Sequence, residues 1–272
     1  MVLHPINPQP CPTIRYKPRP GALPVWTVIA ERQKQCARSW WLIAQPDHAG
    51  LSGDLAANFI SPRFPKIDAD IAKAIAFHDA GWAMFPPEAQ PDLPPMISDD
   101  FKPRSFIEFP PQDFLRAWTA SIDRGESICA AGGVMVSRHF AALAQFRLKE
   151  QIDVEADQRL VRDFVDHELA RQQRLSAKAG LTADDADGLL KVLQFCDVLS
   201  LYLCCGADED VEFPQRFNGE PVRLTRVDDL CVLTPSPFQT DAQHPRTVSL
   251  GVAARSYPSR DPKTTTLPFL LQ

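Results

Sequence analysis

Apolar and polar positions follow two different patterns along the chain, one in the middle and one near the ends. From about residue 50 to 206, apolar residues recur at intervals of three and four, which places them on one face of an α-helix. Near the ends, at about 24–45 and 211–258, the apolar runs are short and rich in β-branched and aromatic residues, as in "PVWTVIA", "SWWLIAQ" and "TVSLGVAARSYP". The first two of these runs flank a polar stretch and are typical of a hairpin. We therefore expect a mainly α fold, a helical bundle with a small β-sheet formed from the N- and C-terminal parts.

Local signals predict where several of these helices begin. Asp68 suits the N-cap of a helix over "DADIAKAIAFHD", and Pro111 suits the first turn of a helix through "QDFLRAWTASI". Thr182 or Asp184 can cap "DGLLKVLQFCDVLSLYLCC", which is apolar on nearly all sides. A helix of that composition belongs at the centre of the fold.

The first 24 residues differ in composition from the rest. They run from "HPINPQPCPT" to "KPRPGALP", with frequent proline and no periodicity. Such a composition does not build a hydrophobic core, so we expect a proline-rich, disordered tail over 1–24. Residues 25–272 are expected to form a single domain, with the helical core at about 50–206 and terminal β elements at about 24–45 and 211–258.

Composition and charge exclude several classes of partner. The 272 residues carry a net charge of -5, and no cluster of lysine and arginine marks a nucleic-acid surface. No apolar run approaches the length that spans a bilayer, and the N-terminus lacks the pattern of a secretory signal. The seven cysteines form no Cys-x-x-Cys pair and are typical of free thiols. We expect a cytoplasmic protein that acts on a small-molecule substrate and binds neither nucleic acid nor a membrane.

Asp197 is the most informative residue, because it lies inside the most apolar helical run. An ionised carboxylate on a buried helix costs several kcal/mol, roughly, unless it is paired or binds a cation. The nearest preceding cation, Lys191, is more than one turn away. Two explanations remain: a metal ion held with histidines from elsewhere in the chain, or a purely structural hydrogen bond to a backbone group or a histidine. We favour the metal, since first-row metals prefer mixed imidazole and carboxylate ligands.

The adjacent pair His78 and Asp79 closes an alanine-rich helical run. Neighbouring residues on a helix point about 100° apart, so both can reach one ion only at a helix end or with the ion between them. Gly81 follows closely and lets the chain turn away. The pair therefore stands where a metal site needs it.

These residues carry a resemblance to known families. His48, then His78 and Asp79, then a lone Asp197 in a late apolar helix resemble the ordered signature of the HD superfamily of helical metal-dependent phosphohydrolases. More closely, "WLIAQPDHAGLSGDLA", "AIAFHDAGW", "LQFCDVLSLYLC" and "LTPSPF" are similar to a bacterial family catalogued as domain of unknown function 3891, from about residue 25 to the end. The first resemblance implies an HD-like helical bundle and a ligand pattern; the second has no established activity to carry over.

The HD resemblance also implies roles for individual residues. It makes His48, His78, Asp79 and Asp197 the ligands of a first divalent ion, with Asp79 able to bridge to a second. His139 is the best candidate to bind that second ion, and His167 is the next, although its charged helix fits a surface role equally well. The cofactor is therefore one or two divalent ions, with manganese, iron, zinc, cobalt and magnesium all open.

Three functions are compatible with this set of ligands. The leading expectation is a metal-dependent hydrolase of a phosphate ester, with His78 and Asp79 as catalytic residues and a water activated by the metal. The second is a diiron oxygenase on the same ligands, because iron also accepts imidazole and carboxylate. The third is a non-catalytic helical scaffold that keeps a structural metal or a polar network.

Overall fold

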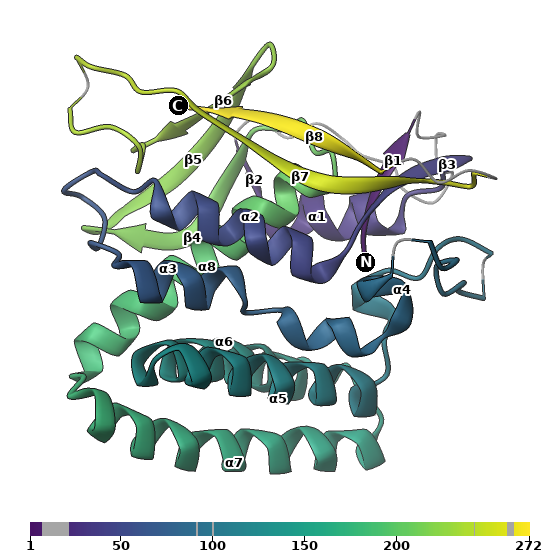
Figure 1. Ribbon diagram of the computed structural model, residues 1–272, viewed down its shortest axis with the longest axis horizontal. Coiled ribbons are helices and arrows are strands. Elements are labelled where there is room, and N and C mark those ends of the chain that lie inside the picture. Colours follow the sequence, from purple (N-terminus) through teal and green to yellow (C-terminus); the bar gives the residue numbers. More distant parts are fainter. Residues whose placement is uncertain (7–21, 91, 100, 242, 260–263) are drawn as a thin grey trace.

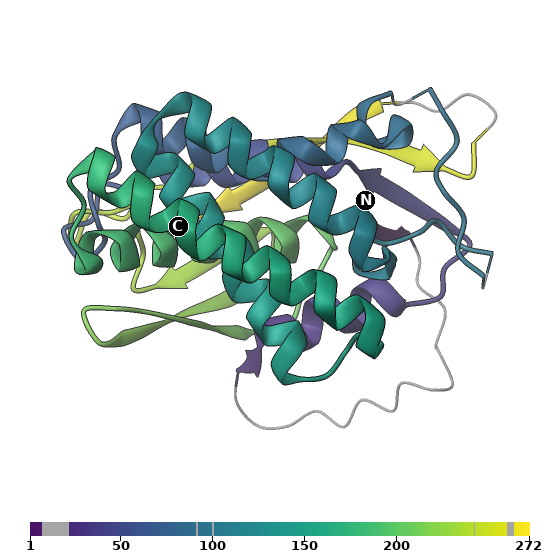
Figure 2. The ribbon, with the colours of Figure 1, turned by 90° about the horizontal axis from the view of Figure 1, so that it is seen from below.

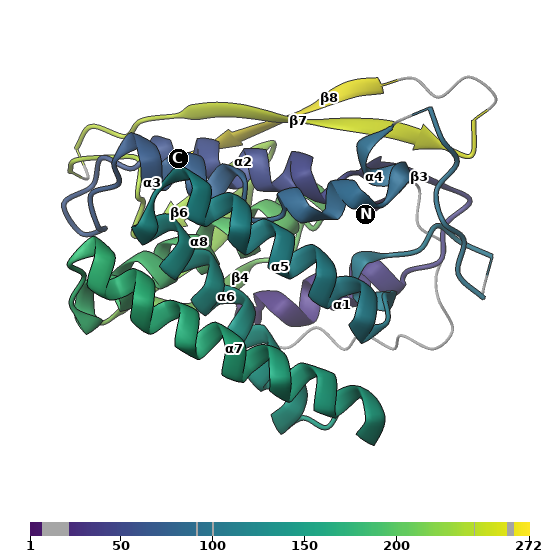
Figure 3. The ribbon, with the colours of Figure 1, turned by 60° about the horizontal axis from the view of Figure 1, so that its bottom comes forward.

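The computed structural model describes residues 1–6, 22–90, 92–99, 101–241, 243–259 and 264–272. The strands form one mixed sheet, curled into a half-barrel, and the helices are stacked to one side of it (Figures 1 and 3). Helices α1, α2 and α8 contact the sheet, and the packed group of α5, α6 and α7 lies farther away from it. Seen from below, this second group lies in front of the strands (Figure 2).

The helices occupy most of the chain between residues 45 and 204. Their bounds are α1 Val25–Lys34, α2 Gln45–Ala57, α3 Ala69–Ala76, η1 Ala80–Met84, α4 Pro86–Ala89, η2 Phe106–Glu108, α5 Pro111–Ile128, α6 Ala130–Lys149, α7 Glu155–Ala179 and α8 Ala183–Cys204, where η marks a 3-10 helix. The predicted helical core at about 50–206 is therefore present.

Among the described residues, the sheet has eight strands that come from both ends of the chain. They are β1 Val2–Ile6, β2 Leu23–Pro24, β3 Ser39–Ile43, β4 Val211–Phe217, β5 Glu220–Val227, β6 Leu230–Thr234, β7 Val248–Tyr257 and β8 Thr264–Leu271. The order across the sheet is β1-β3-β7-β8-β6-β5-β4-β2. The β6–β8 and β2–β4 pairs are parallel and the other pairs are antiparallel.

The predicted fold class is wrong. Of the described residues, 51% are helical and 21% are in strand conformation, in an eight-stranded sheet, so the chain has an α/β fold rather than a mainly helical bundle with a small sheet. The sheet is larger than predicted because β1 and β8, which both contain proline, lie outside the β elements expected at about 24–45 and 211–258. Pro5 lies in the edge strand β1, and Pro268 lies in β8 where the strand pairs only with β7. Proline is tolerated at such positions because one side of the strand needs no N–H donor.

Two further predictions near the N-terminus need correction. Residues 2–6 are not disordered: they form β1, and Val2 and Leu3 are fully buried against the neighbouring strand and helices. Residues 7–21 of the predicted tail lie outside the described residues. The predicted hairpin is also wrong, because 25–34 forms helix α1. Its buried residues Val25, Val28 and Ile29 follow the helical period, and this packing outweighs the β propensity of the run.

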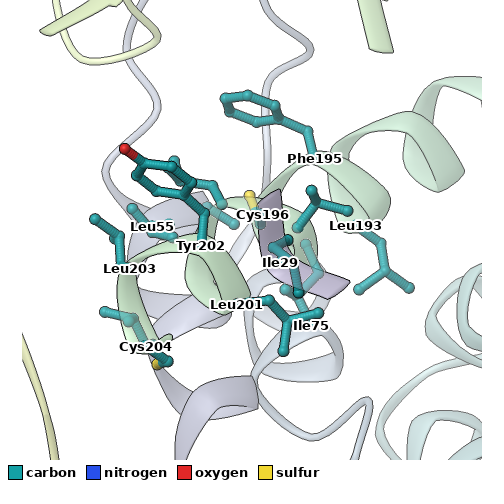
Figure 4. Packing of buried hydrophobic residues seen from close by; sticks show 14 of the residues in the cluster. Ile29, Leu55, Ile75, Leu193, Phe195, Cys196, Leu201, Tyr202, Leu203 and Cys204 are labelled. Carbon is teal, nitrogen blue, oxygen red and sulfur yellow. The ribbon is translucent and has the colours of Figure 1, made fainter. Parts of the chain in front are cut away.

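Helix α8 lies at the centre of the core, as its all-round apolar sequence predicts. Its buried side chains meet side chains from three other helices (Figure 4). The labelled partners are Ile29 of α1, Leu55 of α2 and Ile75 of α3. Among the described residues, no helix has both the length and the apolar character required to cross a membrane.

Candidate metal centre

Five of the predicted site residues lie together in the interior. His48 comes from α2, His78 and Asp79 from the turn between α3 and η1, His139 from α6 and Asp197 from α8. All five are buried, with between 0 and 6% of their surface exposed. The fold thus gathers residues that are up to about 150 positions apart in the sequence.

Two glycines allow the helices around this cluster to approach one another. A Cβ on Gly53 of α2 would lie 2.4 Å from the Cβ of Ala76 in α3, so this glycine permits the contact between the helices that lead to His48 and His78. A Cβ on Gly81 would lie 2.0 Å from the carbonyl oxygen of Ala117 in α5. The turn that carries Asp79 can rest on α5 only because residue 81 has no side chain.

Asp197 points at the histidines. Its Oδ1 lies 3.4 Å from Nε2 of His78 and 3.9 Å from Nδ1 of His48. Its Oδ2 lies 3.7 Å from Nε2 of His139. One carboxylate therefore has two histidines on the side of one oxygen and a third histidine beside the other.

The hydrogen bonds of Nδ1 fix the tautomers of two histidines. Nδ1 of His78 lies 2.8 Å from the carbonyl oxygen of Ile75, which only accepts, so this nitrogen carries the hydrogen and Nε2 carries the lone pair of the neutral ring. Nδ1 of His48 lies 2.9 Å from Oγ of Ser200, whose own hydrogen goes to the carbonyl oxygen of Asp197. His48 therefore also donates from Nδ1, and its Nε2 faces Asp79. Metal-binding histidines are commonly held in this way.

Asp79 completes the arrangement. Its Oδ2 lies 2.8 Å from Nε2 of His48 and 3.9 Å from Nε2 of His78, and its Oδ1 accepts a hydrogen bond of 3.1 Å from Nε1 of Trp82. A carboxylate oxygen and a lone pair do not stay 2.8 Å apart unless a hydrogen-bonding proton or a metal ion lies between them.

Burial and the charges of the cluster shift the pKa values of two histidines in opposite directions. Burial lowers the pKa of His78, but the carboxylates of Asp79 and Asp197 outweigh it and raise the pKa to about 9. Burial lowers the pKa of His139 to about 4, with Asp197 opposing the shift only in part. Burial would raise the pKa of Asp197, yet contact with His78 keeps it below its usual value. Without a metal, protonated His78 is thus the counter-charge of Asp197.

Within the described residues, His48, His78 and Asp197 form a group that could hold a metal ion, since one ligand atom of each lies within 4.8 Å of the others. Nε2 of His78 is buried and makes no hydrogen bond in the described part of the chain, which suits a ligand. Asp79 and His139 border this group. A proton on His78 and a cation are therefore alternatives for the same space.

The structure does not bring His167 to the group. Its side chain is 66% exposed on α7, and its Nδ1 lies 3.1 Å from Oε1 of the neighbouring Glu168. It lines neither of the two cavities that reach the cluster. The predicted surface role of this charged helix fits His167 better than ligation does.

Two cavities meet at the cluster. An inner cavity of about 190 Å³ is lined by His48, Asp79, His139 and Asp197 together with a set of aromatic rings. An outer cavity of about 990 Å³ shares His139 and Asp197 with it and extends to Lys191 and Arg216. The cluster is therefore reached from a space large enough for a small molecule, which a closed structural metal site does not require.

Sequence reasoning missed three residues of this region. Ser200 and Ser52 form a hydrogen-bonded pair behind His48, with Oγ atoms 2.8 Å apart, and Gln45 lines the inner cavity. Each lies three or four positions from a predicted ligand on the same helix, which places it on the same helical face. That spacing was the available signal.

Comparison with known proteins identifies the family to which the chain belongs. The family described as "Protein of unknown function (DUF3891)" matches residues 31–249, which is most of the chain. No curated protein and no solved structure matches the chain.

Proposed function

Because the chain belongs to this family of unknown function, its activity must be inferred from the site, and we propose that it is a metal-dependent hydrolase of a phosphate ester. The observation that carries the proposal is the buried group of His48, His78 and Asp197, in which the Nδ1 atoms of both histidines make hydrogen bonds and their Nε2 atoms face Oδ2 of Asp79. Of the resemblance to the HD superfamily, only the order of these residues along the sequence supports it, because the fold is not the HD-like helical bundle that the resemblance implied.

The donor set fits a first-row divalent ion. His48, His78 and Asp197 would hold it, and Asp79 would approach the same ion from the side of His48. His139 would serve a second ion, because it faces the other oxygen of Asp197. When bound, such an ion lowers the pKa of its water toward about 7, so that hydroxide is available at neutral pH.

The remaining groups position the reactants. Trp82 holds Oδ1 of Asp79, which leaves Oδ2 directed into the cluster to accept a proton from the attacking water. The inner and outer cavities give the substrate access to this point, and Lys191 and Arg216 of the outer cavity attract an anion.

A diiron oxygenase remains a second candidate because of one observation. Among the described residues that line the inner cavity, the single guanidinium, Arg147, already makes two hydrogen bonds to Asp153, of 2.9 and 2.5 Å. The walls are otherwise mostly aromatic. An apolar substrate, which oxygen chemistry can attack, suits such walls better than a phosphate does.

Metal content and turnover together test the proposal. Protein purified without added metal would be analysed for manganese, iron, zinc, cobalt and magnesium, and then assayed for phosphate release from a panel of phosphate esters and for oxygen consumption. We expect at least one equivalent of a first-row metal, and phosphate release that stops in chelator. Iron-dependent oxygen consumption without phosphate release would favour the oxygenase, and bound metal without either activity would favour the scaffold.

A pair of variants on α8 gives the control. Asp197→Asn should abolish both the metal and the phosphate release. Asp187→Asn makes the same chemical change at a half-exposed position that pairs with Arg138, and it should leave both unchanged.

A further inference from the structure

The inner cavity beside the cluster has walls of mutually packed aromatic rings. The rings of Trp82 and Phe109 lie 5.1 Å apart edge to face, and those of Trp118 and Phe140 are stacked at 5.0 Å. All four residues are buried and belong to the main hydrophobic core, so the walls are fixed by packing. An apolar protein cavity of about 150 Å³ binds benzene. A cavity of about 190 Å³ therefore suits one ring with a short substituent.

One buried side-chain amide in this wall donates no hydrogen bond within the described part of the protein. Gln45 is 1% exposed, and its Nε2 is buried without a hydrogen-bond partner among the described residues. Its backbone N–H donates to Oε2 of Glu88 at 2.8 Å, so the main-chain donor is satisfied and the side-chain N–H group is not. An unpartnered buried amide is costly, and such groups are rare unless they serve a ligand.

The position of Gln45 connects this amide to the cluster. Gln45 precedes His48 by three residues on α2, so the two side chains share a helical face, and both line the inner cavity. Outside the cluster, the lining also includes the polar residue Arg147, which is already paired with Asp153 and covers the ring of Phe114 at 4.7 Å. Nδ1 of His139 is also buried without a partner among the described residues, but it belongs to the cluster, so the Gln45 amide is the donor beside the aromatic wall that we assign to a ligand.

We propose that the inner cavity binds a compact aromatic group that carries a hydrogen-bond acceptor, and that the Gln45 amide donates to that acceptor. This defines the substrate class of the candidate metal centre. The substrate contains a single aromatic ring, and an acceptor oxygen lies near the edge of that ring. The assignment of this ring to a substrate rests on the proposed function, whereas the binding of the ring does not.

The test uses the full chain in chelator, so that no metal contributes. Acetophenone and isopropylbenzene have nearly the same shape, but only acetophenone has an acceptor oxygen. Their dissociation constants would be measured by ligand-observed NMR. Gln45→Met keeps the length of the side chain and removes the amide. We expect it to weaken acetophenone about tenfold, the value of one hydrogen bond, and to leave isopropylbenzene unchanged.

The outer cavity offers a matched control. Gln215 lines that cavity but not the inner one, and it is also buried with an unpartnered amide oxygen. Gln215→Met should leave both dissociation constants unchanged. The melting temperature gives a second readout: Gln45→Met removes an unpartnered polar group, so it should melt at the same temperature as the parent protein or higher.

Three results would overturn the inference. They are the absence of saturable acetophenone binding, an equal loss of acetophenone affinity in the two variants, and a lower melting temperature of Gln45→Met with a loss of both ligands, which would mean that the amide is structural. Because metal is absent from the assay, ring binding in a protein that hydrolyses nothing would support the inference and contradict only the proposed function.

Discussion

At the scale of single residues, the main energetic feature of the cluster is a buried negative charge. Asp197 is 5% exposed inside an apolar helix, and the sequence alone predicts that it needs a cation or a hydrogen-bonding partner. The structure places His78 where its protonated ring is that partner, and a cation bound by the same atoms would be the alternative. The two forms respond to pH in different ways, which makes them separable in solution.

The histidines predict how the stability of the metal-free protein varies with pH. His78 has a pKa of about 9 in the folded chain and an ordinary value of 6.5, so its contribution is complete below 6.5 and is lost as the pH rises to about 9. His139 has a pKa of about 4, so its contribution is complete above 6.5 and is lost as the pH falls to about 4. In chelator, the free energy of unfolding from denaturant titrations should therefore peak near pH 6.5.

Substitutions show which histidine causes the acid loss of stability and which causes the alkaline loss. His78→Ala should remove the alkaline loss and His139→Ala the acid loss, each of which is at most about 1.4 kcal/mol per pH unit for one proton. Bound metal should also remove the alkaline loss, because it requires neutral His78 at every pH. A flat profile for the metal-free parent protein between pH 5 and 9 would contradict this account of the cluster.

At the scale of the elements, helix ends and close contacts place the ligands. The N-cap at Asp68 and the first-turn Pro111 occur as their local sequences predict, and of the two candidate caps Thr182 and Asp184 it is Thr182 that caps α8, because each of these features depends on neighbours within one turn. The turn that follows α3 depends on a distant contact instead. It lies where it does because Gly81 fits against α5.

Gly81→Ala should therefore displace the turn that carries His78 and Asp79. The added Cβ would lie 2.0 Å from the backbone oxygen of Ala117, which cannot rotate away, so we expect a loss of about 1–3 kcal/mol in unfolding free energy together with weaker metal binding. Gly188→Ala on α8 is the control. It has open space around it and should be neutral or stabilise the protein by up to about 1 kcal/mol. Denaturant titrations and metal titrations of both variants measure the difference.

At the scale of the whole molecule, local pattern and long-range pairing were not equally predictable. The helical middle, the central position of α8 and the supply of strands from both ends follow from period and composition. The size of the sheet does not, because β1 and β8 become strands only through partners far along the chain. In the same way, the sequence suggested that His48, His78, Asp79, His139 and Asp197 belong together. It could not show that the helix of His167 turns that residue to solvent.

The pairing of β1 leads to a prediction that a disordered tail would not. Leu3 is 1% exposed, so Leu3→Ala should lower the free energy of unfolding by about 2–5 kcal/mol. In a disordered segment the same change would have no effect. Leu169→Ala, at a 43% exposed position of α7, should stay within about 0.5 kcal/mol of the parent protein. Urea titrations of the two variants compare them directly.

The central claim is that the buried group of His48, His78 and Asp197 binds a divalent metal, and paired thermal melts of the parent protein and Asp197→Asn test it most directly. At a hundredfold excess of metal over its dissociation constant, binding should stabilise the parent protein by about 2.7 kcal/mol relative to chelator. Asp197→Asn should gain almost nothing from manganese, iron or zinc, because a neutral amide replaces the anionic ligand. In chelator the two proteins should differ much less. Equal metal-induced shifts in the two proteins would show that Asp197 does not bind the ion and would contradict the account.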